Sequence, residues 1–285
     1  MKILITGANG QLAGEFQRLL ENYPHEVTAL DRETLDISND DHVNKAFLAH
    51  APDIVLNCAA YNLVDRAEED FESAFRVNAL GVRNLALACR KTNALLVHYS
   101  SDYVFDGTKE DFYTEEDETN PLNNYGKSKL SGENFLKEET DDFLVFRVSW
   151  VFGEGKQNFL YKLLQWAKQK KVLKVVCDQI SVPTCTRDIA HLTMFAINKG
   201  LRGMYHLTNS GYASRYEVAR FFLERLGMDN LVLPVRSDSF PSPAKRPYFS
   251  AMSSLGLAEA LNVEIPAWKI GIESYVEAMF EQEEI

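Results

Sequence analysis

The chain of 285 residues lacks any run of about 20 apolar residues, the length that a helix needs to cross a membrane. Its short apolar start is interrupted by Gly7 and Asn9, unlike a secretory signal peptide. We therefore expect a cytoplasmic protein. Because 46% of its residues are hydrophobic, the chain is expected to bury a sizeable core.

Cysteine is scarce, and basic residues are outnumbered by acidic ones. The four cysteines are scattered with no C-x-x-C pair, which argues against a disulfide framework and against a zinc site, so we expect buried and inert thiols. A formal net charge of −11 opposes binding to nucleic acid, and no basic stripe interleaved with aromatic residues offsets it. Any phosphate-bearing ligand must therefore be held by local cations and backbone amides.

The amino-terminal segment has the pattern of a dinucleotide-binding unit. A short apolar strand, residues 2–6, ends at a glycine turn, residues 7–14, and apolar residues then recur at helical spacing. The turn reads G-x-x-G-x-x-A in place of the familiar G-x-G-x-x-G. Such a turn can also be purely structural. A second strand, residues 26–30, delivers Asp31 near the place where an acidic residue holds the adenosine ribose, which favours a nucleotide cofactor.

Strand-like and helical segments alternate through the first half of the chain, which predicts an α/β fold with a Rossmann-type doubly wound parallel sheet. After about residue 151 helical periodicity dominates, which predicts a smaller, mainly helical cap. We expect residues 1–150 to form the NAD(P)-binding domain, residues 151–285 the substrate-binding cap, and about 178–200 to return to the first domain. The expected strands are 53–57, 94–99, 143–147 and 173–176, and the expected helices 71–91, 158–170, 186–199, 214–226 and 267–281.

Tyr125 and Lys129 stand four residues apart, so on a helix they share one face. An ammonium group beside the phenol would lower the tyrosine pKa toward working pH and make Tyr125 a general acid or base. The spacing alone is weak, because it occurs by chance in many helices. Ser101 follows the fourth strand and is predicted to open onto the same crevice, where its hydroxyl either binds a substrate oxygen or caps its own turn.

Taken together, several motifs resemble the dTDP-4-dehydrorhamnose reductase family of extended short-chain dehydrogenases/reductases, over nearly the whole chain. The motifs are Thr6–Leu12, Asn57–Tyr61, Ser101–Phe105, Tyr125–Lys129, Arg147–Trp150 and Lys245–Pro247. The resemblance implies NAD(P)H-dependent reduction of the 4-keto group of dTDP-4-dehydro-L-rhamnose to dTDP-L-rhamnose. The alternatives are a reductase or epimerase of another nucleotide-linked 4-keto-6-deoxy sugar, or a non-catalytic regulatory homologue.

The resemblance also assigns roles to residues. The catalytic residues would be Ser101, Tyr125 and Lys129. The residues implied for NADPH or NADH are Gly7, Gly10, Gln11, Leu12, Asp31, Asp36, Ile37, Ala59, Ala60 and Tyr61, together with Tyr125 and Lys129, and we add Arg32 because it could reach a 2′-phosphate. Those implied for the sugar nucleotide are Asn62, Val64, Ser101, Trp150 and Arg246.

Three positions depart from the family pattern. Ala13 replaces a glycine of the fingerprint, and Ser101 stands where relatives have threonine, which keeps the hydroxyl. Arg187 lies where a carboxylate of a magnesium-linked dimer is expected, although Glu15 matches another, so no metal is expected. We expect a possible homodimer, and we expect neither nucleic acid nor a membrane as a partner.

Overall fold

The structure is a computed structural model and describes residues 1–283. Its first half alternates strands and helices as the sequence predicts. The elements are β1 (Lys2–Thr6), α1 (Gln11–Leu20), β2 (Glu26–Leu30), α2 (Asp40–His50), β3 (Ile54–Asn57), α3 (Phe71–Phe75), α4 (Gly81–Thr92), β4 (Leu95–Ser101), α5 (Asn124–Glu139) and β5 (Phe143–Val148). The predicted helix over 71–91 contains a π-helical turn, Arg76–Leu80, between α3 and α4.

The second half has short strands and longer helices. Its elements are β6 (Val151–Phe152), α6 (Phe159–Gln169), β7 (Val172–Val176), β8 (Ile180–Ser181), β9 (Thr184–Cys185), α7 (Thr186–Asn198), β10 (Gly203–His206), β11 (Ala213–Ser214), α8 (Arg215–Arg225), β12 (Leu231–Val235), α9 (Leu255–Leu261) and α10 (Trp268–Glu283). None of the helices within residues 1–283 has the length and apolar character needed to cross a membrane.

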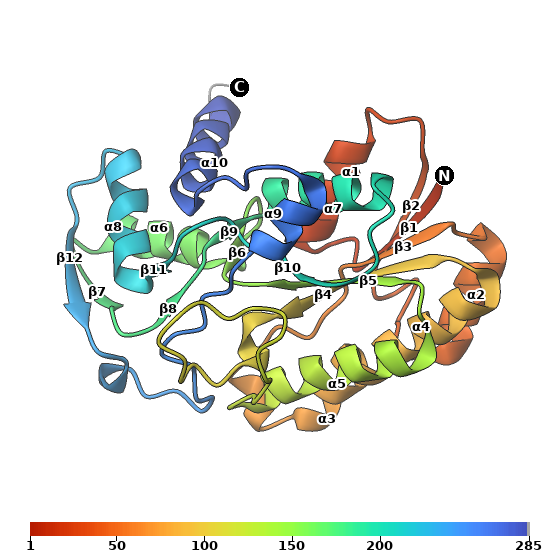
Figure 1. Cartoon of the computed structure of the whole chain (residues 1–285). Helices are drawn as coiled ribbons and strands as arrows, with labels where there is room; N and C mark the ends of the chain where they lie inside the picture. The colour runs from red at the N-terminus through yellow and green to blue at the C-terminus, as the bar shows by residue number, and fades with distance from the viewer. Residues whose placement is uncertain (284–285) are drawn as a thin grey trace.

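The central sheet confirms the predicted doubly wound fold. Six parallel strands lie in the order β2-β1-β3-β4-β5-β10, so the chain changes direction between β1 and β3. Figure 1 shows α1 and α7 on one face of this sheet, and α2, α4 and α5 on the other. Ligands of such sheets bind outside the carboxyl ends of the strands at the point where the order reverses.

Alternation along β1 explains why helices cover both faces. Ile3 and Ile5 point into the core beneath α1 and α7, whereas Leu4 points into the core beneath α2 and α4. All three are at most 1% exposed. Burial of both faces is what a continuous apolar strand predicts.

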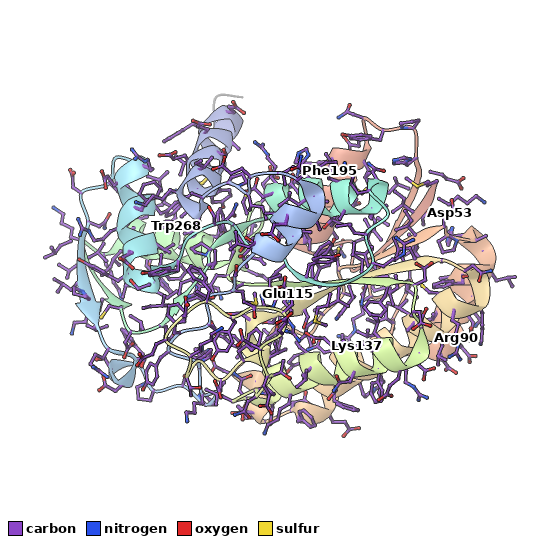
Figure 2. All side chains as sticks on the ribbon, viewed as in Figure 1. Asp53, Arg90, Glu115, Lys137, Phe195 and Trp268 are labelled. Carbon is purple, nitrogen blue, oxygen red and sulfur yellow. The ribbon has the colours of Figure 1, made fainter. Side chains whose placement is uncertain are left out.

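The cap has a core of its own, built from α6, α8, α10 and the parallel pair β7-β12 (Figure 1). Trp268, at the start of α10, lies among these helices (Figure 2), with its ring 5.4 Å from that of Phe221. More chain returns to the sheet than residues 178–200, because β10 adds the last strand and α9 packs on the same face as α1. The division near residue 150 stays a prediction.

Candidate active site

The glycine turn after β1 is shaped for close contact with a ligand. Gly7 has a φ of +66°, and a Cβ there would lie 2.8 Å from the Cα of Ala59. Gly10 is the N-cap residue of α1, and no side chain caps the helix there. Backbone N–H groups at an uncapped helix start attract anions, so these residues fit the pyrophosphate of a dinucleotide.

Two other residues of this turn have side chains committed elsewhere. The Gln11 amide nitrogen donates to the Val151 carbonyl at 3.2 Å, and its oxygen accepts from Asn158 at 3.3 Å. Gln11 therefore links α1 to the start of the second half, and only its backbone is left for a phosphate. Leu12 packs against the core beneath α1.

At the end of β2, Asp31 is held in a fixed orientation. Its Oδ1 accepts from the Thr34 hydroxyl at 2.8 Å and from the backbone N–H of Thr34 at 3.0 Å, and these bonds lower its pKa. Its Oδ2 has only a long contact, 3.4 Å, with the Asn9 amide. This oxygen is thus available to a ribose hydroxyl, as the sequence predicts.

Asp36 and Ile37, also predicted to bind the cofactor, differ in which of their atoms could contact a ligand. Burial tends to raise the pKa of Asp36, but hydrogen bonds from Ser38 and the charge of Arg32 lower it overall. The Ile37 side chain is 2% exposed and packs against Gly81, so only its backbone could face a ligand.

The loop after β3 is pinned over the glycine turn. The Ala59 N–H donates to the Thr6 hydroxyl at 3.2 Å. The Asn78 side chain clamps Tyr61 by accepting from its N–H at 2.8 Å and donating to its carbonyl at 3.0 Å. Ala59, Ala60 and Tyr61 thereby lie beside the reversal point of the sheet, as predicted, and the buried Tyr61 hydroxyl has no partner within residues 1–283.

Ser101 and Tyr125 meet, as the sequence predicts. Ser101 is the last residue of β4, and its hydroxyl lies close enough to Tyr125 to lower the pKa of the phenol in part. The Tyr125 hydroxyl also lies 3.4 Å from the Asn62 amide oxygen. The approach is set by Gly126, where a Cβ would lie 2.2 Å from the Tyr103 carbonyl, so α5 packs directly on the loop that follows Ser101.

The alternative interpretation of Ser101 is also present in the structure. Its hydroxyl oxygen accepts from the Tyr103 N–H at 3.2 Å, which caps the turn after β4, and it donates to Asp102 at 3.1 Å. Asp102 in turn accepts from Ser181 at 3.0 Å and from Ser250 at 2.6 Å. Ser101 is therefore held by its own turn while it faces Tyr125.

The expected effect of Lys129 on Tyr125 is wrong for this structure. Burial raises the pKa of Tyr125, and Lys129 does not lower it. Lys129 Nζ donates instead to the Tyr99 carbonyl at 2.6 Å and lies 3.5 Å from His98 Nε2. Lys129 points onto β4 rather than along α5 toward the phenol. Two residues on one helix face can therefore have side chains that end at different partners.

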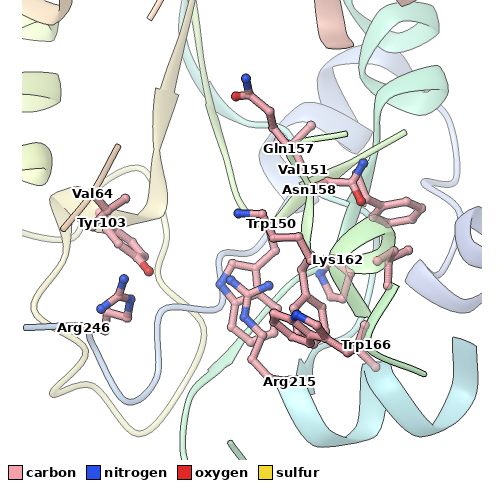
Figure 3. Close-up of a pocket in the computed structure, with 15 residues that line it drawn as sticks. Val64, Tyr103, Trp150, Val151, Gln157, Asn158, Lys162, Trp166, Arg215 and Arg246 are labelled. Atoms are coloured by element: carbon pink, nitrogen blue, oxygen red, sulfur yellow. The ribbon is translucent and has the colours of Figure 1, made fainter. Parts of the chain in front are cut away.

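A cavity of about 410 Å³ opens beside Tyr103, between the loops of the sheet and the cap (Figure 3). It is lined by three of the residues predicted for the sugar nucleotide: Val64, Trp150 and Arg246. Trp150 has a φ of +40°, which is rare for a residue with a side chain and marks local strain. Such strain is often found at functional sites.

Arg246 is held at the edge of this cavity by an ion pair. Its guanidinium binds both oxygens of Asp65, at 3.0 and 2.7 Å, and this carboxylate and the nearby Tyr103 raise the pKa of Arg246 against burial. Asp65 lies in the loop after β3, 181 residues earlier in the chain. The pair therefore connects the loop of residues 241–247 to the sheet.

Sequence reasoning missed two cations that line the cavity, Lys162 and Arg215. Arg215, the first residue of α8, lies over the Trp150 ring, 3.7 Å from its centroid, and within 4.9 Å of the Phe159 centroid (Figure 3). Burial lowers its pKa to about 10, so it stays charged at neutral pH. Its only local signal is its place at a helix start, and its position over Trp150 depends on packing between distant segments.

Comparisons with known proteins agree with this geometry. The family model described as "RmlD substrate binding domain" matches residues 1–281. The dTDP-4-dehydrorhamnose reductase of Burkholderia thailandensis is 38% identical, over 95% of this chain and 97% of that protein. The solved dTDP-4-dehydrorhamnose reductase of Clostridium acetobutylicum is 40% identical and covers 98% of this chain and 100% of its own, with a TM-score of 0.95.

A second solved relative was crystallised with a cofactor. The dTDP-4-dehydrorhamnose reductase of Bacillus anthracis, in complex with NADP, is 35% identical and covers 97% of this chain and 99% of its own, with a TM-score of 0.94. Each of these matches spans nearly the full length of this chain and of the relative. The chain therefore belongs to the RmlD family of dTDP-4-dehydrorhamnose reductases.

Proposed function

We propose that this protein is an NAD(P)H-dependent oxidoreductase that reduces the 4-keto group of dTDP-4-dehydro-L-rhamnose to give dTDP-L-rhamnose. The observation that carries the proposal is the meeting of Ser101 and Tyr125 at the carboxyl end of β4, where the Tyr125 ring lies 5.8 Å from the ring of Tyr103, which lines the cavity. When bound, NADPH or NADH would supply the hydride that adds to carbonyl C4.

The chain's own residues would manage the proton and the carbonyl oxygen. Because burial raises its pKa, Tyr125 keeps its proton at neutral pH and can donate it to the oxygen as negative charge develops there. Ser101 would hold that oxygen beside Tyr125. Lys129, buried behind them, would bind the nicotinamide ribose and favour proton release by Tyr125 once both ligands are in place.

The substrate would occupy the cavity. Val64 and Trp150 give it apolar walls, and Arg215 and Arg246 give it positive charge for the diphosphate. Such local cations are needed because the chain as a whole carries a net charge of −11. The oligomeric state and the cytoplasmic location stay predictions, as does the absence of a metal.

A substrate panel tests the proposed function. We expect NADPH consumption with dTDP-4-dehydro-L-rhamnose, and dTDP-L-rhamnose as the product by NMR. Faster turnover of another dTDP-4-keto-6-deoxy sugar would overturn the assignment of the substrate. Interconversion of sugars without net NADPH consumption would indicate an epimerase, and no turnover of any sugar would favour a regulatory role.

Both reduced cofactors should support turnover. Asp31 can accept from a free ribose hydroxyl but repels a 2′-phosphate, and the exposed Arg32 can offset that repulsion. We expect kcat/KM for NADH and NADPH to differ by less than about 10³-fold, roughly 4 kcal/mol. Arg32→Ala should raise KM for NADPH while KM for NADH stays within about twofold. A larger preference, or an equal effect of Arg32→Ala on both cofactors, would show that these residues do not face the ribose together.

Arg246→Ala should raise KM for the sugar nucleotide by about tenfold or more, because the cavity loses a guanidinium that can bind phosphate or a sugar oxygen. The Kd for NADPH alone should stay unchanged. Asp65→Asn is the matched control, since it releases the same ion pair but keeps the cation. If both variants raise KM equally, Arg246 acts by anchoring its loop rather than by touching substrate.

A further inference from the structure

A row of buried polar side chains crosses the sheet behind the candidate active site. Thr6 on β1, Asn57 on β3 and His98 on β4 are register partners on neighbouring strands, and each is at most 1% exposed. They share the sheet face that α5 covers, and the row ends at Lys129, which is 2% exposed. The reaction derived above gives none of the first three residues a chemical role.

Hydrogen bonds connect the row from end to end. The Thr6 hydroxyl donates to Asn57 Oδ1 at 2.7 Å, and the Asn57 amide nitrogen donates to His98 Nδ1 at 3.0 Å. His98 Nε2 lies 3.5 Å from Lys129 Nζ, which in turn donates to the Tyr99 carbonyl at 2.6 Å. At the other end, Thr6 accepts from the Ala59 N–H over the glycine turn.

With the Asn57 amide in this orientation, the hydrogen bonds are consistent only with a neutral Lys129. If Nδ1 of a neutral imidazole accepts from Asn57, its proton sits on Nε2 and points at Lys129. An ammonium there would place two donors face to face. A neutral amine, in contrast, accepts the Nε2 proton and still donates to Tyr99.

A charged Lys129 requires the opposite direction of donation along the row. His98 Nε2 must then accept, which puts the ring proton on Nδ1, and Asn57 must turn its oxygen toward that proton. An amide can turn over because its oxygen and nitrogen are nearly equal in size. Each direction satisfies the contacts between His98 and its two neighbours, so the row has two states. In the second state Thr6 accepts from both Asn57 and the Ala59 N–H, and its own proton loses Asn57 as an acceptor.

We propose that Thr6, Asn57 and His98 form a hydrogen-bond relay that sets the charge of Lys129, with His98 as a positioning residue that switches tautomer as Lys129 gains or loses its proton. The relay links the glycine turn of the cofactor site to the lysine at the reaction centre. It rests on the proposed function only in assigning Lys129 to the reaction.

Other charged groups near the row are accounted for. Burial lowers the pKa of Lys129 to about 8, and Glu133 on α5 raises it in part. Glu133 is itself bound by Arg147 on β5, at 3.0 and 2.7 Å.

On the opposite face of the sheet, the Tyr99 phenol hydrogen-bonds Thr193. Burial raises the pKa of both this phenol and the Cys58 thiol, so both stay neutral. On α5, the Tyr125 phenol faces Ser101 and also stays protonated. Burial keeps the His98 pKa well below its usual value, so the ring stays neutral throughout.

NMR of the free protein carrying ¹⁵N-labelled imidazole tests the relay without substrate or cofactor. The chain has six histidines, so His98 can be assigned by its loss in His98→Gln. We expect its proton to move from Nδ1 to Nε2 as pH rises through about 8, where Lys129 titrates, with no charged ring in between. Lys129→Met should abolish the switch. One tautomer across pH 6.5 to 9.5, or uptake of a second proton by the ring, would overturn the proposal.

Two matched variants separate positioning from packing. In His98→Gln, the amide reaches about as far as Nε2 of the histidine and keeps an oxygen for Lys129. In His98→Asn, the amide reaches only about as far as Nδ1 and contacts Asn57 alone. If the relay acts, His98→Asn should move the basic limb of the pH profile of kcat down by about one pH unit or more, because the ammonium loses an acceptor, and His98→Gln should hold it near wild type. If the basic limb of the kcat profile lies at the same pH in both variants, His98 only fills space.

This design keeps the two proposals apart. A protein that turns over no keto sugar can still show the tautomer switch, so a failed function leaves the relay standing. A reductase with a fixed His98 tautomer would keep its function and lose the relay.

Discussion

Tyr125→Phe should lower kcat by about 10²-fold or more, since the variant keeps the ring but loses the proton that the developing oxyanion needs. The effect should fall on the chemical step and leave the Kd for NADPH nearly unchanged. Steady-state turnover with the keto sugar, together with cofactor binding by fluorescence, measures both. The raised pKa of Tyr125 agrees with this role, because a donor must hold its proton at working pH.

The control for this variant removes a hydroxyl elsewhere. Tyr113 is 4% exposed and donates its hydroxyl proton to Asp106 at 2.9 Å, in a loop that does not line the cavity. Tyr113→Phe should stay within about twofold of wild-type kcat. If Tyr125→Phe keeps more than about a third of wild-type turnover while chemistry limits the rate, Tyr125 is not the proton donor.

Glu133→Gln should lower the free energy of unfolding by about 3–5 kcal/mol, because it leaves the Arg147 guanidinium buried without its counter-charge. The two side chains are 0% and 3% exposed, and both Glu133 oxygens are bound by Arg147. Urea denaturation of the variant and wild type gives the difference. The charge of Glu133 also raises the pKa of Lys129 in part.

An exposed ion pair offers the matched control. Arg225 and Glu273 lie 3.0 Å apart with side chains 44% and 40% exposed. Glu273→Gln should therefore cost less than about 1 kcal/mol. A double variant, Glu133→Leu with Arg147→Met, should recover much of the loss, since it removes both charges. Equal costs for Glu133→Gln and Glu273→Gln would contradict this account of the buried pair.

The parts of the site that the sequence predicts are those that depend on neighbouring residues. The glycine turn, the helix that carries Tyr125 and Lys129, and the acidic residue after the second strand each follow from spacing within a short segment. The order of strands then places them together, because ligands of parallel sheets bind at the carboxyl ends. This is why Gly7, Asp31 and Ser101 lie where they are predicted to lie.

What the sequence could not predict depends on contacts between distant segments. The end of the Lys129 side chain is set by the Tyr99 carbonyl on another strand, so a rule for helix faces gives the wrong partner. Arg246 is held by Asp65, and Gln11 by Asn158, across more than 140 residues each. Such pairs carry no local periodicity, and they decide which cations are free to meet a ligand.

Transfer of deuterium from cofactor to sugar tests the central claim most directly. NADPH with deuterium at both C4 positions of the dihydronicotinamide ring would be mixed with dTDP-4-dehydro-L-rhamnose and the protein, and the product examined by NMR. Our account predicts one deuterium per molecule, located at C4 of the rhamnose ring, with one NADPH consumed for each product formed. Product without deuterium at C4, or sugar conversion without loss of NADPH, would contradict it.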